Sequence, residues 1–142
     1  MEKQRSSLSI LRERLKYEVY NDRKELGKTP LCPICDGGFT SNAPSMHEVF
    51  IFRGHVRGCK EEVQHQIYVP ENVVLIHEGN CHLKAQHEWA SKIACAIQII
   101  RYESYESVLN WMNLMDSLLR LTDNQKFMLL EEAREKYDES AR

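Results

Sequence analysis

Residues 30–35, Pro-Leu-Cys-Pro-Ile-Cys, and residues 71–82, Glu-Asn-Val-Val-Leu-Ile-His-Glu-Gly-Asn-Cys-His, decide the fold of this chain. The first stretch is a Cys-x-x-Cys knuckle, and a Gly-Gly turn follows it. The second stretch contains an apolar, β-branched run that predicts a strand, and its Cys-His pair then opens a predicted helix. Between them, residues 46–52, Met-His-Glu-Val-Phe-Ile-Phe, predict another strand. The expected order is therefore knuckle, strand, loop, strand and helix.

The cysteines and one histidine of these stretches predict a structural zinc site. Two thiolates at Cys-x-x-Cys spacing can bind one tetrahedral ion from a single turn, and imidazole and thiolate are both good zinc ligands. The four predicted ligands are Cys32, Cys35, His77 and Cys81. Two alternatives stay open: Cys32 and Cys35 are small buried residues without a metal, or Cys59 is the fourth ligand.

The bulk composition sets limits on the protein class. A length of 142 residues fits one domain with at most a small appendage, and a net charge of −2 means that any nucleic-acid-binding surface must be local. No apolar stretch approaches the roughly 20 residues of a membrane span, so no membrane partner is expected. The N-terminal charges are not followed by an apolar segment, which argues against a signal peptide and for a cytoplasmic protein. Five cysteines in such a chain indicate metal binding rather than disulfides.

Helical patterns flank the central region, so the predicted class is α+β. Leu8, Leu11, Leu15 and Val19 recur at helical spacing and predict a helix over residues 3–26 that ends near Gly27. Another helix is expected from Cys81 to about residue 101, a further one from near Ser104, and a last one after Thr122. The predicted organisation is an N-terminal helix (1–28), a zinc-stapled core (29–90) and a C-terminal helical extension (91–142).

Two histidines are placed where a hairpin and its following helix can bring them together. His47 lies on the first predicted strand and His82 at the start of the predicted helix. A divalent ion held between them could bind a phosphate oxygen, and a neutral imidazole could take a proton from an attacking water. The loop between the strands carries Arg53, Arg57 and Lys60, which could contact phosphates; the simpler interpretation is a solvated charged loop.

The ordered set of Cys-x-x-Cys, His-Glu-Val-Phe with Arg-Gly after it, Glu-Asn-Val-Val-Leu-Ile-His and Cys-His resembles the HNH endonucleases. The resemblance is closest to the small versions encoded by bacteriophages, and it covers about residues 30–90. It implies a ββα-metal core that hydrolyses DNA phosphodiester bonds with Mg²⁺ or Mn²⁺. It also implies DNA as the partner, with phage packaging or recombination proteins as further partners and the host cytoplasm as the location.

The resemblance also implies roles for individual residues. The family's first motif places a metal ligand beside a general base, and here that pair is His47-Glu48. Either His47 is the base and Glu48 assists metal binding, or His47 is the ligand. Asn72 matches the family's middle asparagine, which braces the loop between the strands. His82 matches the metal ligand at the start of the helix.

The last family position falls on Gln86 or on His87. Four helical residues advance about 40° beyond one turn and five advance about 140°, so Gln86 shares the face of His82 and His87 points away. Gln86 is therefore a candidate for metal binding through its amide or a water. His87 is a candidate for contact with a DNA phosphate.

Two further interpretations belong to other functional classes. The first is a zinc-stapled binding or adaptor module that keeps this fold without catalysis, which the unusual His47-Glu48 pair, Gln86 and the net negative charge favour. The second is a transcription-factor-like zinc module. It is the weaker one, because the helix from Cys81 has only Lys84 and Lys92 as cations for a recognition surface.

Overall fold

The computed structural model of the chain describes residues 7–25, 31–39, 44–119 and 124–140. It is a mixed α and β structure, mostly helical, with one small sheet, so the predicted α+β class is confirmed at that level. No helix in the described part of the chain is long and apolar enough to cross a membrane. The elements, including the short 3-10 helices η1 and η2, are α1 (Ser7–Glu25), β1 (Ser45–Glu48), η1 (Arg53–Val56), α2 (Glu61–His65), η2 (Pro70–Asn72), β2 (Val73–Ile76), α3 (Asn80–His87), α4 (Trp89–Glu103), α5 (Tyr105–Leu119) and α6 (Gln125–Ser140).

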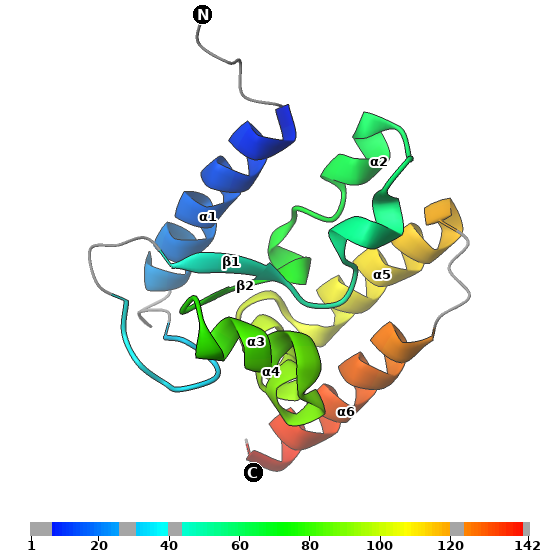
Figure 1. Cartoon of the computed structure of the whole chain (residues 1–142). Coiled ribbons are helices and arrows are strands. Elements are labelled where there is room, and N and C mark those ends of the chain that lie inside the picture. The colour runs from blue at the N-terminus through cyan, green and yellow to red at the C-terminus, as the bar shows by residue number, and fades with distance from the viewer. Residues whose placement is uncertain (1–6, 26–30, 40–43, 120–123, 141–142) are drawn as a thin grey trace, which may run out of the picture.

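The two strands form an antiparallel pair in the middle of the molecule. Ser45 pairs with Ile76 at one end, and Glu48 pairs with Val73 at the other. All four residues of β2 are buried, as expected for a continuous apolar strand that is covered on both faces. Figure 1 shows α1 on one side of the strands and α3 with α4 on the other.

The first strand is shorter than the sequence predicts, because Asn72 turns the chain away from the sheet after Glu48. The side-chain oxygen of Asn72 accepts hydrogen bonds from the backbone N–H groups of Phe50 (2.9 Å) and Ile51 (3.1 Å). Its amide donates to the carbonyl oxygens of Ile51 (2.8 Å) and Ile67 (2.9 Å). A buried asparagine with all four hydrogen-bonding positions filled fixes the shape of the strand connection.

The helix predicted from Cys81 to about residue 101 is two helices. The chain is extended at Glu88 (φ −100°, ψ 124°), which separates α3 from α4. A side-chain oxygen of Glu88 accepts a hydrogen bond from the hydroxyl of Ser91, and Trp89 donates to Glu132 of α6 at 2.5 Å. No proline or glycine marks this break, so tertiary contacts rather than local propensity end α3.

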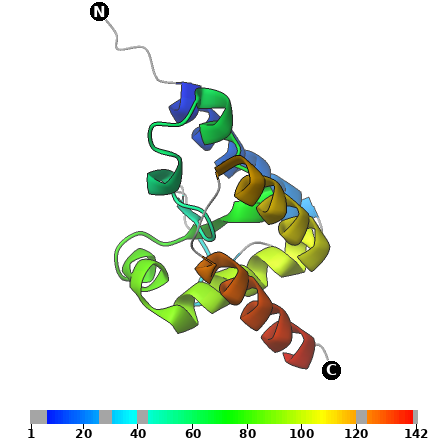
Figure 2. The same ribbon diagram turned by 90° about the vertical axis from the view of Figure 1, so that its right-hand side faces the viewer.

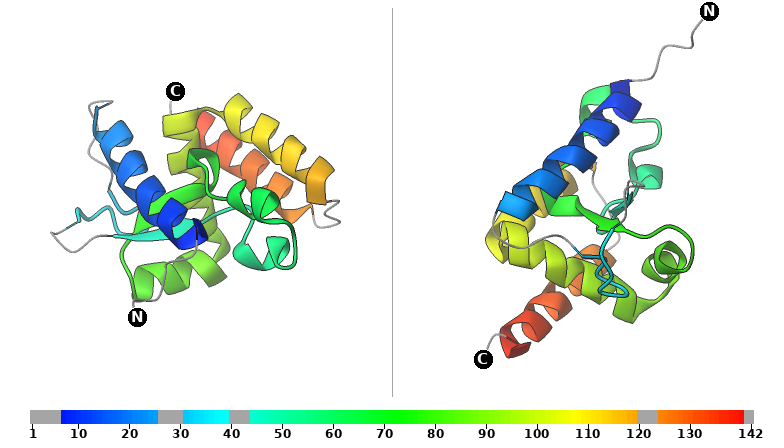
Figure 3. Two further views of the ribbon diagram at one scale, coloured as in Figure 1. Left: turned by 90° about the horizontal axis from the view of Figure 1, so that it is seen from above. Right: turned by 90° about the vertical axis from the view of Figure 1, so that its left-hand side faces the viewer.

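Helix α4 is the centre of the C-terminal half. It contacts α3, α5, α6 and β2, and Figures 2 and 3 show α5 and α6 lying side by side. The expected apolar stripes supply the core at Ile93, Ala96, Val108, Met112 and Leu130. Leu118 repeats the apolar pattern of α5, which predicts a buried side chain, but it is 49% exposed. Gly27, the predicted end of the first helix, and Thr122, which precedes the last predicted helix, lie outside the described residues.

A buried arginine fastens α1 to the centre of the fold. Arg23 is 1% exposed, and its guanidinium donates to the carbonyl oxygens of Val73 (3.1 Å) and Pro70 (3.4 Å). The same group lies 5.0 Å from the ring centroid of Tyr102. Burial lowers the pKa of Arg23 to about 10, although Glu103 opposes the shift, so the side chain is charged at pH 7. The N-terminal helix is thereby positioned against β2.

Candidate functional site

The four predicted zinc ligands come together at one end of the hairpin. Cys32 and Cys35 lie on the knuckle, His77 follows β2, and Cys81 lies in the first turn of α3. Their four ligand atoms all lie within 4.8 Å of one another, and Sγ of Cys35 is 3.2 Å from Nδ1 of His77. A tetrahedral zinc ion spaces its donor atoms roughly 3.5 Å apart. The cluster could therefore bind a metal ion such as zinc.

The knuckle is closed by its own backbone. Cys32 accepts a hydrogen bond at its carbonyl from the N–H of Asp36 (2.8 Å) and donates its own N–H to Gly37 (3.0 Å). A Cβ atom at Gly37 would lie 3.2 Å from Cε1 of His77 and 3.3 Å from Sγ of Cys35. Glycine at this position therefore leaves room for the imidazole and the thiol to approach each other.

The imidazole of His77 is oriented for metal binding. Nε2 lies 2.9 Å from the carbonyl oxygen of Gly38, which can only accept, so Nε2 carries the proton. That leaves the lone pair of Nδ1 facing the cysteines. The hydrogen bond to Gly38 also raises the pKa of His77. A carbonyl that fixes the tautomer and direction of an imidazole is a common support for a metal ligand.

The thiols of the cluster resist simultaneous ionisation without a cation. Burial acts to raise the pKa of Cys32, but the N–H groups of His77, Cys35 and Ile34 outweigh it and bring this pKa down to about 7. Burial and the neighbouring thiols raise the pKa of Cys81 to about 11. A divalent ion would remove this repulsion and bind all of the sulfurs as thiolates.

The two other cysteines lie outside the cluster. Cys59, the reserve ligand, is partly buried beside α2 and is not part of this ligand group. Cys95 is buried in α4, and burial raises its pKa to about 12, so it is an inert core thiol. In the described ranges, no other group of three or more histidine, cysteine or acidic side chains brings its ligand atoms this close together.

A cleft of about 520 Å³ is lined by residues of β1, η1, α1, α3 and α4, and two imidazoles face each other in its wall. His47 of β1 and His82 of α3 meet edge to face, with ring centroids 5.3 Å apart and an interplanar angle of 73°. Glu48, the only carboxylate among the lining residues, lies beside them. Nε2 of His82 is 3.3 Å from the side-chain nitrogen of Gln86, so both residues share one face of α3. These four lining residues are candidates for an ion site.

The environment keeps His47 neutral. The side chain is 5% exposed, and burial, followed by the electrostatic influence of the nearby His82 and Lys92, lowers the pKa of His47 to about 4. A neutral imidazole offers a lone pair to a proton or to a metal ion at pH 7. An anionic phosphate in the cleft would raise this pKa towards the working pH.

Three cations line the cleft with these groups: Arg12 of α1, Arg53 of η1 and Lys92 of α4. Only Arg53 was predicted from the sequence. No local sequence pattern predicts that Arg12 and Lys92 line the cleft. Arg12 lies on an amphipathic helix, and Lys92 lies on the helix that follows the break at Glu88. Arg57, Lys60 and His87, the other predicted DNA contacts, are exposed and are not part of the cleft lining.

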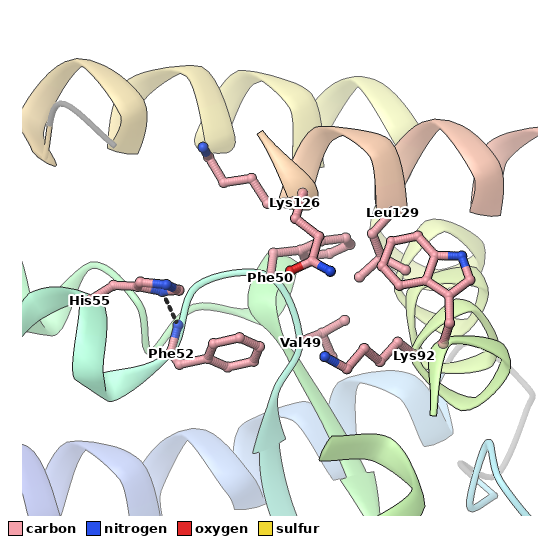
Figure 4. A pocket seen from close by; sticks show the side chains of 9 residues that line it. Val49, Phe50, Phe52, His55, Lys92, Lys126 and Leu129 are labelled. Atoms are coloured by element: carbon pink, nitrogen blue, oxygen red, sulfur yellow. Dashed lines mark hydrogen bonds between the residues drawn. The ribbon is translucent and has the colours of Figure 1, made fainter. Parts of the chain in front are cut away.

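The position of Lys92 is fixed at the back of the cleft by an aromatic ring. Its ammonium lies 5.8 Å from the ring centroid of Phe52, and both residues also line a pocket of about 30 Å³ between η1, α4 and α6 (Figure 4). His55 accepts a hydrogen bond from the backbone N–H of Phe52 (3.0 Å) and so holds the start of η1. This pocket has room for a water molecule and not for a nucleotide base.

Asn72, which matches the middle residue of the HNH pattern, is buried and does not line the cleft, so it does not touch a substrate there. Its hydrogen bonds to the strand connection are the bracing role that the resemblance implied.

Comparisons with known proteins give no match: no family model, curated protein or solved structure matches this chain. What the chain does is therefore inferred from the side chains described above.

Proposed function

We propose that this protein is a metal-dependent endonuclease that hydrolyses DNA phosphodiester bonds in the cleft at His47 and His82. The observation that carries the proposal is the edge-to-face pair of imidazoles in a cleft with Glu48 and three cations. Cations attract a phosphodiester, the neutral imidazole accepts a proton, and the carboxylate and second imidazole suit a divalent ion. The resemblance of residues 30–90 to HNH endonucleases agrees with this chemistry.

In the favoured assignment His47 is the general base. It takes the proton of a water molecule as the water oxygen attacks phosphorus and the leaving ester oxygen departs. Glu48, His82 and Gln86 would hold Mg²⁺ or Mn²⁺, which stabilises the negative charge that develops on the phosphate. Arg53 and Lys92 would hold the phosphate from the sides. The other assignment, with His47 as a metal ligand, uses the same cleft and a different base.

The Cys32 cluster has a supporting role in this proposal, as a structural zinc site. Cys81 directly precedes His82, so an ion at the cluster would fix the start of α3 against the knuckle and the end of β2. Because the two imidazoles come from different elements, their separation depends on how α3 sits against the hairpin. Zinc would thus set the geometry of the cleft without taking part in the reaction.

A plasmid-nicking assay with Mg²⁺ or Mn²⁺ tests the proposal. Wild-type protein should convert supercoiled plasmid to nicked or linear forms, and His47→Ala should slow this about 10²- to 10⁴-fold because the proton acceptor is lost. His82→Ala should also be strongly impaired. His65→Ala is the matched control, since His65 lies on α2 outside the cleft and contacts Glu61. Equal cleavage rates for wild type and His47→Ala, with zinc content unchanged, would show that His47 is not the general base.

A nucleic-acid-binding module without catalysis is the second candidate function. One observation favours it: within the described ranges, the cleft side chains do not form a convergent group of three metal ligands, whereas the cysteine cluster does. Such a module would bind one zinc ion and DNA and would never cut. Tight DNA binding without nicking in any divalent metal would establish this function in place of the nuclease.

A further inference from the structure

A second cleft of about 300 Å³ adjoins the first, between α1, η1 and α2. Arg12 and Arg53 line both clefts, so the two spaces meet at these guanidinium groups. The remaining lining residues, Leu8, Ser9, Val56, Gln64 and Tyr68, include no carboxylate. The second cleft is therefore a positively charged continuation of the first.

Tyr68 organises the junction between the two clefts. It is 4% exposed, and its hydroxyl accepts a hydrogen bond from Nε of Arg53 at 3.3 Å. The guanidinium carbon of Arg12 lies 5.6 Å from the centroid of the same ring. Both cations are thus placed by one buried aromatic side chain, which reduces the conformational entropy that they lose when they bind an anion.

Guanidinium groups bind phosphate oxygens in a fixed, forked geometry, so two of them at a cleft whose own lining contains no carboxylate favour a phosphate ligand. We propose that the second cleft is a phosphate subsite for nucleic acid, which binds the backbone next to the phosphate held in the His47 cleft. This inference rests on the proposed function to the extent that nucleic acid occupies the first cleft. It also assigns the N-terminal helix a direct part in binding, through Arg12.

Charge changes at Ser9 test the subsite, since Ser9 is exposed on α1 and lines only the second cleft. The affinity of a fluorescent single-stranded oligonucleotide is measured by anisotropy in 50 mM salt without added divalent ions. Ser9→Glu should weaken binding about fivefold relative to Ser9→Gln, because the carboxylate repels the phosphate, and Ser9→Lys should tighten it. Asn113→Glu, on the exposed face of α5, adds the same charge elsewhere and should leave the affinity at the wild-type value.

The salt dependence provides an independent readout. Arg12→Ala should make the plot of log affinity against log salt shallower by about 0.7, the value expected for one lost phosphate contact to a single strand. Competition with inorganic phosphate at constant ionic strength separates a nucleic-acid subsite from a site for free phosphate. Displacement of the oligonucleotide by sub-millimolar phosphate would indicate the latter and would overturn the assignment.

Equal affinities for Ser9→Glu and Ser9→Gln would also overturn it, as would an absence of oligonucleotide binding by the wild type. These outcomes differ from a failure of the proposed function. A protein that cuts DNA but is insensitive to Ser9→Glu lacks the subsite and is still a nuclease. A protein that binds through this cleft and never cuts has the subsite and no catalytic activity.

Discussion

The cysteine cluster lies at the Ile76 end of the strand pair and the histidine cleft lies along β1 towards Glu48, and the two differ in how completely they are assembled. The cluster brings four ligand atoms within 4.8 Å of one another. The cleft holds two imidazoles 5.3 Å apart by ring centroids and one carboxylate, around an open space of about 520 Å³. Three sulfur ligands and one imidazole, which together fill a tetrahedral coordination shell, suit a permanent ion. Nitrogen and oxygen donors beside an open, cationic space suit an exchangeable ion and an anionic substrate.

Under the proposed function, the cluster should support the cleft. Cys81 and His82 are neighbours in the first turns of α3, and one faces the cluster while the other faces the cleft. A change in the cluster should therefore affect both stability and the cleft, whereas a change in the cleft should leave the cluster intact. The following changes test this asymmetry.

The largest effect is expected from the cluster itself. Cys32→Ser should abolish stoichiometric zinc binding and lower the free energy of unfolding by more than about 3 kcal/mol, because the ion would stabilise the knuckle, β2 and α3 together. Zinc content and thermal unfolding measure this. Cys59→Ser is the matched control and should retain zinc. A Cys32→Ser protein with normal zinc content and stability would contradict the role of the cluster.

The second-largest effect on stability is expected from a change in the strand connection. Asn72→Ala leaves four backbone groups without their side-chain partner, and the expected loss is about 3 kcal/mol of unfolding free energy. Chemical denaturation measures it, with Asn113→Ala on the exposed face of α5 as the control. Zinc content should not change. If Asn72→Ala is as stable as the control, the asparagine does not brace the connection.

The cleft should make stability depend on pH through His47. Its pKa is about 4 in the folded protein and about 6.5 when unfolded, so only the unfolded chain takes up this proton between these values. The contribution of neutral His47 to the free energy of unfolding is thus fully present above pH 6.5 and is lost as the pH falls to about 4. This contribution amounts to up to about 3 kcal/mol. Denaturation curves of wild type and His47→Asn without added divalent ions should diverge in this window, and parallel curves would show an unshifted histidine.

The smallest effect should come from the glycines of the knuckle. Gly37→Ala places a methyl group 3.2 Å from Cε1 of His77 and should weaken zinc binding about tenfold, as changes to supporting groups of metal ligands do. Gly38→Ala meets no atom within 4 Å and is the matched control. Competition with a zinc chelator compares the two. Equal affinities would mean that the knuckle tolerates the added methyl group.

Much of the core could be predicted from the sequence, because its signals are local. Cys-x-x-Cys spacing with His77 and Cys81 identifies four side chains that the structure brings together, and the β-branched run at residues 73–76 identifies a strand that the structure buries completely. The helices and the apolar stripes of α4 and α5 follow from periodicity. These features depend on residues that are close together in the chain, so the sequence pattern predicts them.

The parts that could not be predicted depend on contacts between distant segments. The break at Glu88 has no proline or glycine and is accompanied by a hydrogen bond from Trp89 to Glu132 of α6. The approach of Arg12 to the cleft depends on how α1 crosses the hairpin, which Arg23 fixes through carbonyl groups near β2. Lys92 enters the cleft because the break redirects α4. None of these arrangements follows from spacing within a segment.

The most direct test of the account measures DNA cleavage and zinc content together while Mn²⁺ is added to protein that was purified without it. The account predicts about one tightly bound zinc per chain throughout, with a cleavage rate that rises from zero and saturates with Mn²⁺. The same titration of His82→Ala should keep the zinc and lose the cleavage. Cleavage without Mn²⁺ that disappears only when zinc is removed, or no cleavage at any Mn²⁺ concentration, would contradict a separate ion site in the cleft.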